Sequence, residues 1–252
     1  DPLQSYYKPL LVKEALRTVP FLVVTDVFMT DTARMADIVL PSSTFAEKEG
    51  TYTNMSRHVQ RVAPAVIPQG MSKPDFDILI EMASALGKPF ENTDVTGVQQ
   101  EIEKGTPAYK GVFPGDKSVQ WKLDSANTNP KFHINESTAD QNNASGDFPF
   151  TLQTNNHMFH IGSYSQHAKA LVDIGPECIA GIHPEDAKKL GVSTGDQIVV
   201  ESSAGKVEVK VKTSKVTSVG MLYIPKNWVN VPVNALRNGE EGLINVKISK
   251  AG

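Results

Sequence analysis

The sequence predicts a partial open parallel α/β sheet followed by a β-rich barrel with one short helix. Two short apolar runs, residues 21–24 and 37–40, are bounded by turn residues and flank a helical pattern over 31–35, which is typical of buried parallel strands and their crossover. After residue 148 the apolar residues recur with a period of 2 instead of 3.6. This change of period separates two structural blocks.

The first block contains two further helical patterns. Residues 10–19 lead directly into the first strand, and Asp75–Leu86 carries apolar residues at helical spacing with Gly87 just beyond, where a helix commonly ends. In open α/β sheets, ligands bind outside the carboxyl ends of the strands. We therefore expect the polar loops that begin at Thr25 and Pro41 to face a ligand.

A long stretch without periodic structure separates the blocks. From Lys104 to Asp147 the composition turns to Gly, Pro, Asn, Ser and Lys, and it reads as a series of turns. So long a stretch is unusual inside a compact domain and is typical of an interdomain connection. The predicted domains are residues 1–103 and 148–252, joined by a linker over 104–147.

The second block shows the alternation of β strands. Strands are predicted over residues 148–153, 197–201, 206–212 and 221–224, with a tight hairpin turn at Ser203-Ala204-Gly205. His183–Gly191 places Pro at the first helical position, acids in the first turn, bases in the last and Gly beyond. The pattern indicates a barrel with one short helix.

Composition excludes several classes of protein. A net charge of −3 without a Lys/Arg stripe argues against a general nucleic-acid binder. No apolar run approaches the ~20 residues needed to span a bilayer. Cys178 is the only cysteine, so no intrachain disulfide and no Cys-based iron-sulfur or zinc site can form. We expect Cys178 to be a small buried hydrophobic residue.

Polar residues of the first block allow two interpretations each. Asp26 and Thr30 lie where a carboxylate or a hydroxyl could contact a ligand, but capping of the following helix is the favoured structural interpretation. Glu47 and Glu49 have no third group beside them, so we expect structural or solvent-facing carboxylates. Basic residues follow at Arg57, His58 and Arg61, and they form either an anion site or a solvated strand face.

Three histidines lie close together in the second block. His157 and His160 are three residues apart, a spacing that can bind a metal on a helix, but the surrounding Asn, Gly and Ser favour a loop. Further on, Trp228 could cover a ligand ring, although core packing is the favoured role of a buried tryptophan.

Both blocks resemble one known family. The combination TD-x-F-x-TDTA-x-x-ADIVLP-x-x-x-F-x-EKEGT-x-TN resembles the molybdopterin oxidoreductase superfamily, which includes formate dehydrogenases and the large iron-sulfur subunit of NADH:quinone oxidoreductase. The second block resembles the molybdopterin-dinucleotide-binding cap of that superfamily, a double-psi β-barrel. The residues that carry this second resemblance are Ile182–Ala187, Leu190-Gly191, Gly195-Asp196 and Asn234–Leu236.

The resemblance implies a cofactor and a set of contact residues. The cofactor would be molybdopterin guanine dinucleotide with molybdenum or tungsten, shared with residues outside this chain. No catalytic residue and no metal ligand is assigned within the chain. The implied cofactor-binding residues are Asp26, Thr30, Asn54, His58, His160, Gly162, Ser165, Gln166 and Asn234.

Two of these positions depart from the family pattern. His58 stands where Arg is common, and its charge depends on pH. Gln166 also stands where Arg is usual, and Gln offers only neutral hydrogen bonds in place of a bidentate charged clamp. Both departures favour a chain that holds no pterin, whereas Asn54, His160 and Asn234 favour cofactor binding.

The leading hypothesis is the C-terminal part of a molybdopterin-family oxidoreductase, either a fragment or a processed subunit, inactive when alone. Its partners would be an N-terminal portion or companion subunit that carries the iron-sulfur clusters, and other electron-transfer subunits. The alternative is a cofactor-free structural subunit that resembles the large complex I subunit and serves assembly. A third possibility is an independent barrel that binds a partner or small molecule. We expect a cytoplasmic location, with peripheral attachment to a membrane complex left open.

Overall fold

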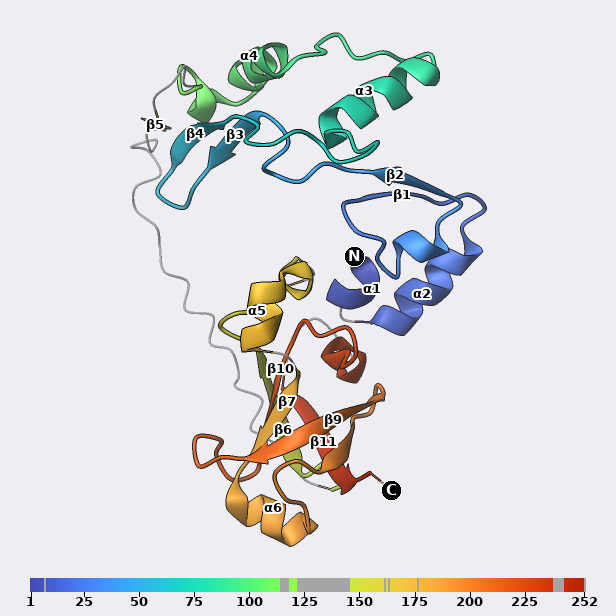
Figure 1. Cartoon of the computed structure of the whole chain (residues 1–252), viewed down its shortest axis with the longest axis vertical. Coiled ribbons are helices and arrows are strands. Elements are labelled where there is room, and N and C mark those ends of the chain that lie inside the picture. The colour runs from blue at the N-terminus through green and yellow to red at the C-terminus, as the bar shows by residue number, and fades with distance from the viewer. Residues whose placement is uncertain are drawn as a thin grey trace. The chain divides into compact units, whose positions relative to one another are not determined.

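The computed structural model describes residues 1–6, 8–113, 118–121, 146–160, 162, 164–175, 177–237 and 243–251 (Figure 1). By contacts between Cα atoms, the chain divides into a barrel unit, Asp1–Pro20 with Ile134–Gly252, and an α/β unit, Phe21–His133. No helix among the described residues is long and apolar enough to cross a membrane.

A closed barrel of six strands forms the centre of the barrel unit. Its strands follow one another around the barrel in the order β10, β6, β11, β8, β9 and β7. The pairs β10–β6 and β7–β9 are parallel, and the other pairs are antiparallel. The strands are β6 (Phe150–Asn155), β7 (Ile179–Ile182), β8 (Gln197–Glu201), β9 (Lys206–Thr213), β10 (Met221–Pro225) and β11 (Ile244–Lys250).

Alternation of side chains explains why these residues form a barrel. In β9, the sequence KVEVKVKT buries Val207, Val209 and Val211 and exposes the charged residues between them. The buried side chains of all six strands join one apolar cluster, which also contains Cys178 and Trp228. The predicted buried roles of Cys178 and Trp228 are therefore confirmed.

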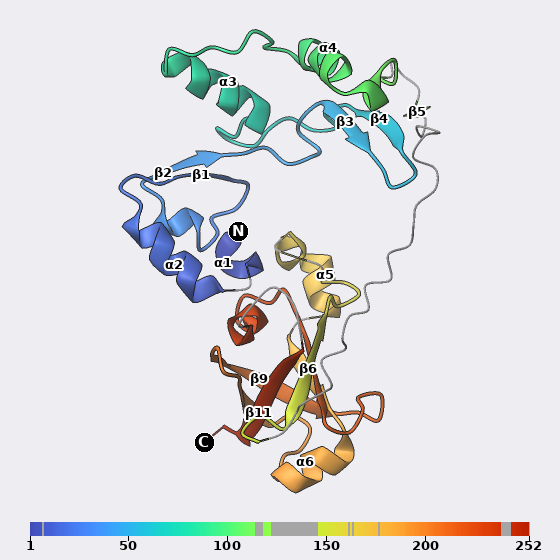
Figure 2. The ribbon, with the colours of Figure 1, turned by 180° about the vertical axis from the view of Figure 1, so that it is seen from behind.

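Short helices close the ends of the barrel. In α6 (Pro184–Leu190), Pro184 opens the helix, and Gly191 ends it with φ 66°, a conformation that favours glycine. The other helices of this region are η4 (Ser165–His167), α5 (Lys169–Ile174) and η5 (Val233–Leu236). In both views of the ribbon, α5 and α6 lie at opposite ends of the barrel (Figures 1 and 2).

The first residues of the chain belong to the barrel unit. They form α1 (Pro2–Ser5) and α2 (Pro9–Thr18), and α2 contacts η5 of the barrel. Residues 1–20, which the prediction placed in the first domain (residues 1–103), thus belong to the barrel unit. The domain limits stay a prediction; the contact between α2 and η5 shows only that the first residues pack with the barrel unit.

The α/β unit contains the predicted parallel strand pair. β1 (Val23–Asp26) and β2 (Ile38–Pro41) pair in parallel with Asp26 opposite Pro41, and a 3₁₀ turn, η1 (Ala33–Met35), replaces the expected crossover helix. Helix α3 (Asp75–Ala85) matches the predicted pattern, with Gly87 at φ 72° beyond it. The backbone is extended again at Ala36, with φ −74° and ψ 147°, so only one 3₁₀ turn forms where the pattern predicted a helix.

The α/β unit also contains a second sheet and elements that reach beyond residue 103, the predicted edge of the first domain. β3 (Gly50–Thr53), β4 (His58–Val62) and β5 (Val119–Gln120) form an antiparallel sheet. Helix α4 (Val95–Gly105), which the sequence pattern did not reveal, is capped by Asp94 and followed by η2 (Pro107–Tyr109). The predicted linker therefore contributes η2 and β5 to the α/β unit, while residues 122–145 lie outside the described part.

Candidate functional site

The nine predicted site residues fall in two units. His160, Gly162, Ser165, Gln166 and Asn234 belong to the barrel unit. Asp26, Thr30, Asn54 and His58 belong to the α/β unit. The barrel set lies in two loops that begin at one edge of the barrel, because β6 and its parallel neighbour β10 end together at Asn155 and Pro225. These two segments, residues 156–167 and 226–237, are called here the barrel loops.

His160 is a buried polar residue of the first barrel loop. It is 5% exposed, and its ring lies 4.0 Å from the indole of Trp228 between centroids. The Nε2 atom lies 2.7 Å from the backbone carbonyl oxygen of Asn227. A carbonyl only accepts, so Nε2 carries the proton and donates. The Nδ1 atom lies 3.0 Å from the hydroxyl of Ser165, which leaves neither ring nitrogen without a protein partner.

Ser165 closes the turn that follows His160. Its hydroxyl accepts the N–H of Gly162 at 3.3 Å. Its single proton serves one of two acceptors, the carbonyl of Gly162 at 2.7 Å or Nδ1 of His160 at 3.0 Å. A Cβ atom added to Gly162 would meet no atom of the described residues within 4 Å. Gly162 therefore presents bare backbone with open space in front of it, whereas Ser165 is occupied by its own loop.

Asn234 holds the N-terminal segment. Its side-chain Nδ2 donates to the carbonyl of Gln4 at 3.0 Å and to that of Ser5 at 3.3 Å. In return, Nε2 of Gln4 donates to the carbonyl of Asn227 at 3.0 Å. The amide predicted to touch the cofactor thus already serves contacts within the barrel unit.

The side chains of Gln166 and Lys226, in the barrel loops, retain unused donors. Gln166 is half-buried and forms no side-chain hydrogen bond with any described residue. Lys226, whose backbone N–H donates to Asn155 at 3.0 Å, has no ion-pair partner within the described parts of the chain. The sequence pattern did not reveal Lys226, Asn227 or Gln4, because no local spacing marks them.

A cavity of about 460 Å³ is lined by His157 of the first barrel loop and by Pro225, the last residue of β10. Its volume falls in the usual range of ligand pockets. The Nδ1 atom of His157 is buried without a hydrogen-bond partner among the described residues. Since both nitrogens of His160 are engaged, a metal held by His157 and His160 together is disfavoured. The lining also includes outward-facing residues of four strands, namely Gln153, Ile179, Gly181, Lys212 and Tyr223.

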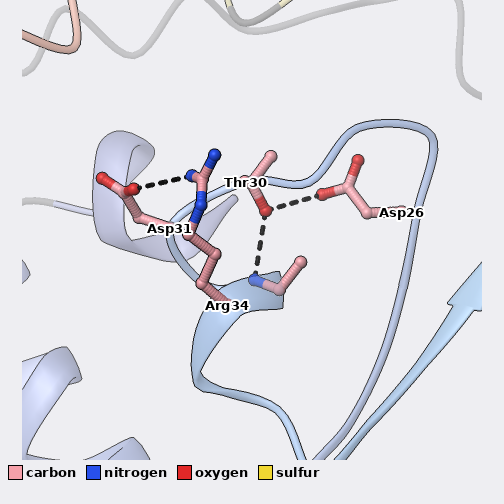
Figure 3. A network of polar contacts seen from close by, with 5 residues as sticks. Asp26, Thr30, Asp31 and Arg34 are labelled. Atoms are coloured by element: carbon pink, nitrogen blue, oxygen red, sulfur yellow. Dashed lines mark hydrogen bonds and ion pairs between the residues drawn. The ribbon is translucent and has the colours of Figure 1, made fainter.

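In the α/β unit, Asp26 and Thr30 build a self-contained turn (Figure 3). The carboxylate of Asp26 accepts the Phe28 N–H and the Thr30 hydroxyl, each at 3.2 Å. The Thr30 oxygen in turn accepts the Ala33 N–H at 3.2 Å, which is the capping role. Asp31 pairs instead with Arg34 at 3.2 Å. The capping interpretation therefore describes Thr30, and the predicted ligand contacts stay untested.

Asn54 and His58 close the turn between β3 and β4. The side-chain oxygen of Asn54 accepts the His58 N–H at 3.0 Å, and Nδ1 of His58 lies 2.8 Å from the hydroxyl of Ser118. Between them, Arg57 adopts φ 65° and donates from its guanidinium to the carbonyl of Trp121 at 3.1 Å. The basic residues here contact their own unit, and their role toward an anion stays a prediction.

Glu47 and Glu49, which lie in the loop after β2, differ in their surroundings. Glu47 is 8% exposed and accepts the N–H groups of Thr44 at 2.7 Å and Gln69 at 3.2 Å. The hydrogen bond from the Thr44 backbone lowers the pKa of Glu47 and keeps it ionised. Glu49 is exposed beside Arg61 at 3.9 Å. Glu47 thus has a structural position and Glu49 a solvent-facing one, the two positions expected for these carboxylates.

Comparisons with known proteins identify the family. Residues 1–85 match the family described as molybdopterin oxidoreductase, and residues 150–246 match the molybdopterin dinucleotide binding domain. The chain belongs to the molybdopterin oxidoreductase family. The barrel loops lie inside the second match, in a type of domain that binds the molybdopterin dinucleotide.

Several relatives are parts of larger enzymes. The chain is 33% identical over 250 residues to the alpha subunit of the F420-dependent formate dehydrogenase of Methanocaldococcus jannaschii, covering 90% of this chain and 37% of the relative. It is 30% identical over 246 residues to one NADH-quinone oxidoreductase subunit of Rhizobium meliloti, covering 95% of this chain and 28% of the relative. The chain thus spans well under half the length of these relatives.

A solved structure shares the fold. Acetylene hydratase from Pelobacter acetylenicus matches with a TM-score of 0.72 at 19% identity, and the match covers 99% of this chain and 43% of that chain. The expected combination of an α/β part with a closed β barrel is confirmed.

Proposed function

We propose that this chain forms part of a molybdopterin-family oxidoreductase and that its barrel loops hold part of the molybdopterin guanine dinucleotide. The observation that carries the proposal is the match of residues 150–246 to the dinucleotide-binding domain, together with open donors in the loops at one edge of that domain. The comparisons do not favour the cofactor-free alternative.

The residues present fit such a group in a specific way. Gly162 leaves open space at its Cα, Gln166 offers an amide donor, and Lys226 offers a positive charge for a phosphate. The unpartnered Nδ1 of His157 adds a buried polar atom in the adjoining cavity. The charge lost with Gln166 in place of Arg would be restored in part by Lys226.

When bound, the metal-pterin group would supply the redox chemistry, and the protein would supply position and electrostatics. The side chains of Gln166 and Lys226 would hold it. We assign no proton-transfer group in this chain. Iron-sulfur ligands would come from other polypeptide segments, because Cys178 is the only cysteine of the chain and is buried.

Elemental analysis of the purified assembly that contains this chain tests the proposal. We expect molybdenum or tungsten in the assembly and the fluorescence of oxidised pterin after its extraction. Gln166→Ala and Lys226→Ala should each lower the retained pterin about fivefold, the loss of roughly one hydrogen bond or charge contact. Lys188→Ala, on α6 at the far end of the barrel, is the control and should retain the wild-type amount (Figure 1).

Absence of both metal and pterin from the assembly would refute cofactor binding and would support the alternative of a cofactor-free structural subunit. Formate, the substrate named in several relatives, is the first redox substrate to assay with the assembly. We expect the isolated chain to show no formate oxidation, and turnover by the chain alone would contradict its proposed place within a larger enzyme.

A further inference from the structure

One backbone carbonyl joins three segments that are far apart in the sequence. The carbonyl oxygen of Asn227 accepts from Nε2 of His160 at 2.7 Å and from Nε2 of Gln4 at 3.0 Å. These donors lie 67 and 223 residues away from Asn227 along the chain. The N-terminal segment and both barrel loops therefore meet at a single acceptor.

The direction of this carbonyl depends on an uncommon backbone conformation. Asn227 has φ 79°, in the left-handed region that non-glycine residues seldom adopt and that asparagine tolerates best. Its side-chain Nδ2 donates to Oδ1 of Asn156 at 2.8 Å, a second bond between the two barrel loops. Both the residue type and the conformation thus direct the carbonyl toward His160 and Gln4.

The N-terminal segment is held from two sides. Asn234 donates its amide to the carbonyls of Gln4 and Ser5, while the Gln4 side chain reaches back to Asn227. Helix α2, which follows, contacts η5 of the second barrel loop. Residues 1–5 therefore form polar contacts with the second barrel loop, although the whole α/β unit lies between these two segments in the sequence.

We propose that Asn227 is a positioning residue that fixes the geometry of both barrel loops, and that His160 and Asn234 act through it and the N-terminal segment. Their polar atoms bind protein: His160 bonds to Asn227 and Ser165, and the Asn234 amide nitrogen bonds to Gln4 and Ser5. The part of this inference that concerns the cofactor rests on the proposed function. Direct contacts to the cofactor then fall to Gln166, Lys226 and the backbone at Gly162.

A matched pair of substitutions tests the role of the carbonyl. Asn227→Gly keeps the left-handed conformation and the carbonyl but removes the bond to Asn156, whereas Asn227→Val disfavours that conformation and turns the carbonyl away. Hydrogen exchange of residues 1–18, measured by mass spectrometry on the full chain, reports whether the N-terminal segment is released. The ring Nε2–H signal of His160, measured by NMR, reports the second bond.

With Asn227→Val, exchange in residues 1–18 should accelerate about tenfold, and the His160 ring proton should exchange with water too fast to observe. With Asn227→Gly, exchange should stay within about threefold of the wild type and the ring proton should persist. Equal effects of both substitutions, or no effect of Asn227→Val, would overturn the proposal.

Should Asn227→Val prevent folding, Gln4→Ala gives an independent test. It removes only the bond from Gln4 to the Asn227 carbonyl, so residues 1–18 should exchange several-fold faster while the His160 signal remains. Unchanged exchange would overturn the proposed link to the N-terminal segment. None of these measurements requires bound cofactor. An assembly without pterin would therefore refute the proposed function while leaving this inference intact.

Discussion

The barrel and the α/β unit are stabilised by different forces. Every barrel strand is hydrogen-bonded to two neighbours around one continuous apolar cluster. Among the described residues of 21–133, the buried hydrophobic side chains are only Ala33, Val59, Ile78 and Val112, and the sheets have two and three strands with open edges. The barrel is thus stabilised by its own apolar core, whereas hydrogen bonds and ion pairs contribute a larger share of the stability of the α/β unit.

Carboxylates make the key polar bonds of the α/β unit. Glu47 gathers the N–H groups of Thr44 and Gln69, and Asp75 accepts from Ser42 and from Lys48, the latter at 2.7 Å. Burial raises the pKa of Asp75, but the hydrogen bonds from Lys48 and Ser42 outweigh it and lower the pKa. These bonds depend on ionised groups, so this unit should respond to pH where the barrel core does not.

The largest predicted effect concerns the thiol of Cys178 in the barrel. Burial raises its pKa to about 12, and its Sγ atom donates to the Pro225 carbonyl at 3.4 Å. Near neutral pH the folded chain should react with a neutral thiol reagent about a thousandfold more slowly than the unfolded chain, since the thiolate is the reactive form. The measurement is alkylation followed by mass spectrometry.

The same reaction in denaturant supplies the reference rate, because the chain has only one cysteine. Native labelling at a rate close to that reference would mean that the barrel opens readily, and the contrast between the two units would fail. Slow labelling that becomes fast only upon unfolding would make Cys178 a reporter of barrel integrity.

The parts of the fold that could be predicted are those marked by local sequence patterns. Capping residues and glycine marked α6 and α3, and alternation marked β8, β9 and β10, because the forces that form these elements act within a few residues. β7 has four residues including Gly181, too short a pattern to stand out. The alternation in β11, with Val246 and Ile248 buried, is present in the sequence but lies outside the predicted strands.

The candidate site was predictable only in part. Asp26 and Thr30 are only four positions apart, so the capping bonds of their turn could be anticipated from the sequence. The partners of His160 and Asn234 could not, since Asn227 and Gln4 are distant in sequence and are brought to them only by the closed barrel and the packed N-terminal segment. Resemblance indicated which residues lie in the loops, but not what each one contacts.

A smaller effect is predicted for the pH dependence of the α/β unit. The pKa of Glu47 is lowered, chiefly by the hydrogen bond from the Thr44 backbone, below the ordinary value of 4.5. Its stabilising contribution is therefore fully present above pH 4.5 and is lost as the pH falls through the lowered value. Glu47→Gln should remove this part of the acid sensitivity.

Hydrogen exchange of peptides from residues 41–70, compared between pH values above and below 4.5, measures the effect. Glu49→Gln is the matched control, because that carboxylate is exposed and lies 3.9 Å from Arg61. If Glu47→Gln has the same pH profile as the wild type, then the two hydrogen bonds from backbone N–H groups to Glu47 do not stabilise the loop. The inference that ionised carboxylates stabilise the α/β unit would then be contradicted.

The smallest effect should come from the turn after β1, where two neighbouring aspartates have different roles (Figure 3). Asp26→Ala removes the acceptor for the Phe28 N–H and the Thr30 hydroxyl and should cost about 1 kcal/mol of local stability. Asp31→Ala breaks only an exposed ion pair with Arg34, so it should cost less than about 0.5 kcal/mol. Hydrogen exchange of residues 23–36 measures both variants. Equal costs would mean that charge rather than the hydrogen-bonded turn holds this loop, because the two substitutions remove the same charge and differ only in the bonds they break.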